Sequence, residues 1–175
     1  MLTSWESFYV IVGSAGGALI GLQFVVIALI ADRRHLANMG SLSAFGTPTV
    51  VHFGAALLLS ALMSVPWPSF GPLSGALGLC GLGGLVYSAI VVRRARRQKD
   101  YEPVWVDWLW YAVLPGLSYA ALTVAAVVLP TRSQLALSVI GAAALGLLLI
   151  GIDNAWDTVT HLVVSNPDGG TKRRH

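Results

Sequence analysis

Charged residues are scarce in this chain of 175 residues. Asp, Glu, Lys and Arg together make up 11% of it, whereas hydrophobic residues make up 55%. A water-soluble domain averages about 25% charged residues, so this chain has too few polar side chains to cover a globule in water. The shortage excludes the ordinary soluble classes and predicts an integral membrane protein, in agreement with a mean hydropathy of +0.72.

Cysteine is also nearly absent, because Cys80 is the only one and it lies within an apolar run. An internal disulfide, a zinc knuckle and a paired-cysteine redox centre are therefore excluded. The sequence has no Asn-x-Ser/Thr acceptor for N-glycosylation. No basic residue precedes the first apolar run, which is longer than a signal-peptide core, so we expect this run to stay as a membrane anchor.

Long uncharged runs fill most of the chain. A helix needs about 20 apolar residues to cross about 30 Å of hydrocarbon, and five runs meet this length. They predict an all-α integral membrane protein, a compact bundle of five transmembrane helices in one domain over residues 1–164, with spans at about 8–30, 48–67, 70–92, 108–129 and 134–160. We expect the second helix to begin at Pro48, with Thr47 as its N-cap. We expect residues 165–175 to form a flexible, basic tail on the cytoplasmic side.

The basic residues are unevenly distributed along these spans. Five spans place ten of the eleven Lys and Arg residues on one side and leave only Arg132 on the other. The positive-inside rule then predicts an outside N-terminus and a cytoplasmic C-terminus. The net charge of +3 therefore indicates orientation rather than nucleic-acid binding. The compact, Gly- and Ala-rich, unglycosylated chain favours the inner membrane of a bacterium. We expect anionic lipid to bind at a basic cluster, Arg93, Arg94, Arg96 and Arg97.

Small residues recur every three or four positions in two of the spans. Such stripes let helices approach closely in lipid. We expect helix packing, and a homo-oligomer, through Gly13, Gly17, Gly21, Gly78, Gly81 and Gly84. Pro115 and Gly116 predict a kink in the fourth helix, because proline removes one helical hydrogen bond.

Candidate functional residues inside or near the spans are few, and a rise of about 1.5 Å per residue puts all of them in the cytoplasmic half: Gln23, His52, Asp107, Asp153, Asn154, Asp157 and His161. Asp153, Asp157 and His161 are four residues apart, so they share one helix face. Carboxylates and an imidazole in this arrangement can bind a metal ion or relay protons. We therefore predict an ion or substrate site made of Asp153, Asp157, His161, Asn154, Gln23 and His52, for a monovalent or divalent cation. If the fifth helix leaves the membrane near Asn154, the same residues form only a solvated helix end or a structural cluster.

These features favour a small oligomeric channel or transporter that moves a cation through the cytoplasmic-half site. A non-catalytic membrane partner or assembly subunit is one alternative. A metal-dependent intramembrane lipid enzyme using Asp153 and Asp157 is another, and a haem held by His52 and His161 is a third. Only one carboxylate pair is present and no nucleophile triad can be assembled, so catalysis is less favoured than transport.

Overall fold

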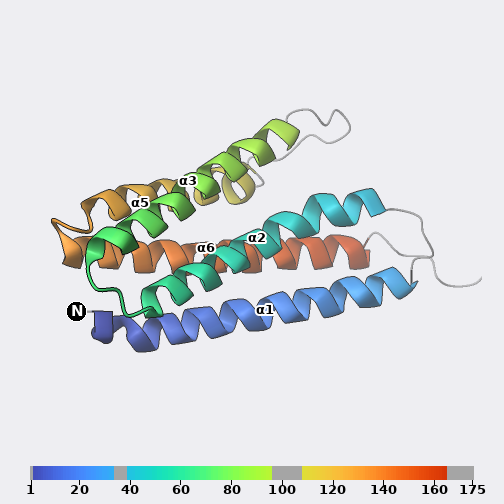
Figure 1. Ribbon diagram of the computed structural model, residues 1–175. Coiled ribbons are helices and arrows are strands. Elements are labelled where there is room, and N and C mark those ends of the chain that lie inside the picture. Colours follow the sequence, from blue (N-terminus) through green and yellow to red (C-terminus); the bar gives the residue numbers. More distant parts are fainter. Residues whose placement is uncertain (1, 34–38, 96–107, 165–175) are drawn as a thin grey trace, which may run out of the picture.

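The computed structural model describes residues 2–33, 39–95 and 108–164, which are helical throughout apart from short turns (Figure 1). A short 3₁₀ helix, η1 (Leu2–Trp5), precedes α1 (Glu6–Arg33). The remaining elements are α2 (Met39–Ser64), α3 (Phe70–Ala95), the π-helical turn η2 (Leu109–Val113), α5 (Leu114–Val128) and α6 (Ser133–Val164). No strand occurs in these ranges, so the predicted all-α class is confirmed.

Four helical segments of the described chain are long and apolar enough to cross a membrane: Leu2–Leu29, Phe70–Arg94, Leu109–Val128 and Ser133–Thr160. A fifth apolar helix, Pro48–Ser64, is shorter. The protein is therefore a multi-pass membrane protein. The tail at 165–175 lies outside the described residues.

The start of α2 differs from the prediction. The helix begins at Met39, nine residues before Pro48, so Thr47 lies within the helix and does not cap it. A proline inside a membrane helix is tolerated because neighbouring groups can satisfy the freed carbonyl. The sequence pattern located the apolar part of the helix and missed its polar extension.

The order in which the helices pack differs from their order in the chain. They lie along one axis with alternating direction (Figure 1), and α6 is central, between α2 and α5. Helix α1 packs on α2, and α3 packs on α5. In the most apolar stretch of α6, 56% of the residues are buried inside the protein, whereas the corresponding share in the other three spans is 28% or less. Although α2 and α3 are joined by a short connection, they contact each other only sparsely.

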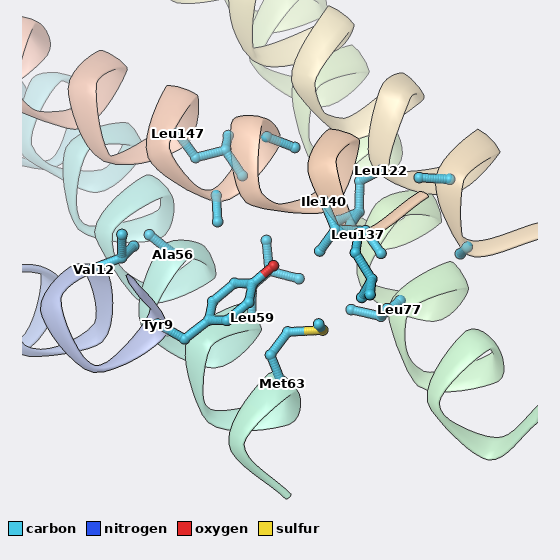
Figure 2. Close-up of a cluster of buried hydrophobic side chains, with 14 of the residues drawn as sticks. Tyr9, Val12, Ala56, Leu59, Met63, Leu77, Leu122, Leu137, Ile140 and Leu147 are labelled. Atoms are coloured by element: carbon cyan, nitrogen blue, oxygen red, sulfur yellow. The ribbon is translucent and has the colours of Figure 1, made fainter. Parts of the chain in front are cut away.

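The two ends of this bundle differ in charge. The C-terminal ends of α1, α3 and α6 lie at one end (Figure 1), which we call the basic end because Arg93 and Arg94, in the last turn of α3, are there. Arg132, in the turn between α5 and α6, lies at the opposite end, with the N-terminus. The half of the bundle near the N-terminus is filled by apolar side chains from all five helices (Figure 2), among them Leu59, Leu77, Leu122, Leu137 and Ile140.

A change of helix type occurs where the fourth predicted span was expected to kink. Before Pro115 the backbone forms a π-helical turn, in which the Leu114 N–H bonds to the Leu109 carbonyl. Pro115 then occupies the first turn of α5, where its missing N–H costs least. The wide π-helical turn η2 is therefore followed directly by a proline, where the regular helix α5 begins.

Candidate functional site

Buried polar side chains gather in the half of the bundle nearer the basic end. Contacts at two glycines establish the register of the helices there. A methyl group on Gly151 of α6 would lie 2.5 Å from the Phe53 ring of α2, and one on Gly16 of α1 would lie 3.2 Å from the Phe53 carbonyl. These contacts place α1, α2 and α6 at a common level near Phe53.

Three buried polar side chains lie between the level of Phe53 and the basic end. Asn154 is three residues beyond Gly151, Thr49 is four residues before Phe53, and Gln23 is seven residues beyond Gly16. With a rise of about 1.5 Å per residue, they lie about 4.5, 6 and 10.5 Å from that level, within about 6 Å of one another in depth. All three are buried. We call these three side chains the polar layer, which crosses α1, α2 and α6 over about 6 Å of depth.

Asn154 is the least satisfied member of this layer. Its side chain is 0% exposed, and neither its amide nitrogen nor its amide oxygen has a hydrogen-bond partner. The hydroxyl of Thr158 donates to the Asn154 backbone carbonyl at 2.8 Å, which leaves the side-chain amide unpaired. Buried polar groups are almost always paired. The bare amide therefore indicates a place for a polar partner such as water or an ion.

The direction of the Asn154 side chain follows from its neighbours on α6. Gly151 faces Phe53 of α2, whereas Gly146 faces Ser118 of α5. At 100° per residue, Asn154 lies about 60° from the first direction and about 80° from the second, between the two. It therefore faces the interior between α2 and α5.

A hydrogen bond joins α2 and α5 in the same region. His52 Nδ1 and the Tyr119 hydroxyl are 3.1 Å apart, and each residue is only 2% exposed. The Tyr87 ring of α3 meets the His52 ring edge-on, with centroids 6.4 Å apart. Three helices thus contribute to one cluster, which is centred on the His52–Tyr119 hydrogen bond. The structure brings His52 and Asn154 toward the same interior.

The predicted acidic face lies at the edge of this site. Helix α6 continues to Val164, well past Asn154, yet Asp153 is only partly buried and Asp157 is exposed. The Tyr111 hydroxyl donates to Asp157 Oδ2 at 3.1 Å. The four-residue period identified residues that share a face. It did not reveal that the neighbouring face, with Asn154 and Thr158, is the buried one.

A metal site of three or more His, Cys, Asp or Glu side chains is not present among the described residues. Asp153, Asp157 and His161 form the predicted metal set. The structure does not describe the side chain of His161, and Asp107 also lies outside the described residues. Only the two carboxylates can therefore be placed.

The predicted packing glycines fall into two groups. A methyl group on Gly13, Gly81 or Gly84 would collide with Ser60, Thr123 or Tyr119 of the neighbouring helix, and one on Gly78 would touch Ala126. Gly17 and Gly21 are exposed with open space before them, and Gly16 packs on α2 in their place. Close packing therefore involves both predicted helices, but with a different register on α1.

An open groove lies beside the cluster, between α2 and α3 with α5 as its floor. It has a volume of about 270 Å³, and its lining includes Gly54, Leu58, Cys80, Gly83, Tyr87 and Tyr119. Sequence reasoning missed this groove and the part that Tyr119 plays in the cluster. One signal was present, since Tyr87 and Tyr119 lie within spans, away from the interfaces that tyrosine usually favours.

No family model, no curated protein and no solved structure matches this chain. Its function is therefore argued from the geometry of the polar layer, the His52–Tyr119 pair and the groove.

Proposed function

We propose that the protein is a five-span transport protein of the bacterial inner membrane, and that it moves a cation through a polar site in its cytoplasmic half. In this proposal the N-terminus is outside and the basic end faces the cytoplasm, as the positive-inside rule requires. The observation that carries it is Asn154, a fully buried amide with no partner for either polar atom.

The chemistry of the surrounding groups favours a cation. An amide oxygen and hydroxyls are hard, neutral ligands, and the carboxylate of Asp153 is next to Asn154 in the chain. Polar and ionisable groups inside a membrane bundle are costly and are commonly found at ion or proton pathways. His52, bonded to Tyr119, can accept and release a proton at this depth. A proton and a small metal cation are thus the two ions to test first.

The apolar half of the bundle supports an access route from one side. Leu59, Leu122, Leu137 and Ile140 close the interior toward the N-terminal end (Figure 2). Within this plug the hydroxyl of Tyr9 is buried and has no partner. A hydrophobic constriction of this kind can gate conduction by excluding water. The site would then load from the cytoplasm and discharge when the plug opens.

We also propose that the protein forms a homo-oligomer, because α1 carries two exposed glycines. Gly17 and Gly21 leave a shallow strip on the outer surface of α1, with open space before both residues. Small residues at this spacing drive helix association where lipid offers no hydrophobic incentive. A second copy of the chain is the partner that we propose for this strip.

The proposal is tested with purified protein in liposomes carrying a proton, Na⁺, K⁺ or Mg²⁺ gradient. Flux above that of empty liposomes is expected for at least one cation. His52→Phe and Asp153→Asn should each remove most of it, whereas Asp157→Asn, at an exposed position, should retain most of it. Flux equal to empty liposomes in all four gradients would refute transport.

A further inference from the structure

The groove between α2 and α3 is unfilled by the protein's own side chains. A methyl group on Gly54 or Gly83 would meet nothing within 4 Å. Apart from the Tyr87 and Tyr119 hydroxyls and the Cys80 thiol, the lining is apolar. Its volume, about 270 Å³, is close to the lower end of the range for small-molecule sites, about 300–1,000 Å³. Because α2 and α3 contact each other sparsely, the groove opens sideways between two membrane helices.

One end of this groove carries positive charge. Tyr87 lines it, and Arg94, seven residues further along α3, lies on the same face of that helix, about 10 Å nearer the basic end. Arg93 and Arg94 are in the last turn of α3. The described parts of α2 and α3 contain no Asp or Glu to neutralise them. The groove is therefore apolar along its length and cationic where it approaches the basic end.

We propose that this groove holds one acyl chain of an anionic phospholipid, with the phosphate at Arg94 and Tyr87. The lengths match: one leaflet with its headgroup layer is about 20–22 Å deep, and the fourteen residues from Arg94 back to Cys80 span about 21 Å. The chain would end beside Cys80. This is a site for a single lipid, more specific than attraction of a basic cluster to a charged surface, and it does not depend on the transport proposal.

The charge at Arg94 sets the expected selectivity. A basic residue near an anionic membrane surface contributes a preference of about fivefold, equivalent to ~1 kcal/mol. Phosphatidylcholine can also fill the apolar part of the groove, but its choline cation offsets the attraction of its phosphate to Arg94. The protein should therefore prefer phosphatidylglycerol to phosphatidylcholine, and the preference should disappear when Arg94 is neutralised.

Cys80, the only cysteine, reports on occupancy because it lines the groove. The full chain is reconstituted in vesicles of phosphatidylcholine or of an equimolar mixture with phosphatidylglycerol, and alkylation of Cys80 by N-ethylmaleimide is timed. We expect alkylation to be slower in the mixture, by up to about fivefold. Arg94→Gln should remove this difference. Arg132→Gln, which neutralises an exposed arginine at the opposite end, should preserve it.

Native mass spectrometry of the detergent-purified protein provides an independent measure, and wild type but not Arg94→Gln should retain phosphatidylglycerol. Equal retention of phosphatidylcholine, or equal alkylation rates in the two vesicles, would overturn the proposal. So would a slow rate in both vesicles together with the mass of a dimer, since a second copy would then cover the groove.

Discussion

Gly84 offers a direct test of how α3 and α5 hold the His52–Tyr119 pair. A methyl group at this position would overlap the Tyr119 ring, so Gly84→Ala must push that ring aside. Overpacking of this kind costs about 1–3 kcal/mol. Loss of the 3.1 Å bond to His52 adds about 1 kcal/mol. The better helix propensity of alanine returns up to ~1 kcal/mol. The net expectation is a loss of about 1–3 kcal/mol in the free energy of unfolding.

The neighbouring Gly83 is a matched control on the same helix. Gly83 is exposed and has open space before it, so Gly83→Ala should be neutral or stabilising by up to ~1 kcal/mol. Reversible unfolding in mixed detergent micelles with increasing dodecyl sulfate, followed by circular dichroism, measures both variants. If the two variants differ by less than ~0.5 kcal/mol, the size expected for a surface change, the described packing of α3 on α5 is refuted.

Three further predictions test other contacts. Tyr119→Phe should cost about 1 kcal/mol in the same unfolding assay, whereas Tyr111→Phe, which removes an exposed bond to a carboxylate, should cost less than half of that; equal losses would contradict the burial assigned to the two hydroxyls. A side chain on Gly141 would collide with Trp5, so Gly141→Val should move tryptophan emission to longer wavelength, and an unchanged spectrum would contradict this contact. Gly17→Leu should reduce the oligomeric mass measured by light scattering while leaving unfolding of the monomer unchanged, and an unchanged mass would remove the proposed interface.

The membrane class could be predicted from sequence because hydrophobic length depends only on position along the chain. Hydrophobic length identifies spans, and a fixed rise per residue converts position into height. Gln23, His52 and Asn154 were therefore predicted to lie inside the bundle, and all three side chains are buried in the structure.

What the sequence could not reveal is rotation of each helix about its axis and the identity of its neighbours. Spacing alone cannot decide whether α6 turns Asp157 or Asn154 inward, because the segment has apolar residues on several sides. The partner of His52 is 67 positions away on a helix that is not its neighbour in the chain. Such contacts follow from the central place of α6, which no local pattern encodes.

The central claim is that Asn154 belongs to an ion site rather than to the packing of the core. Asn154→Leu, of similar size, separates the two roles. Removing an unpaired buried amide should raise the free energy of unfolding by about 1–3 kcal/mol, while cation flux in liposomes falls to the level of empty vesicles. A variant that is more stable and no longer transports is the predicted result. A variant that transports its cation at the wild-type rate would contradict the account.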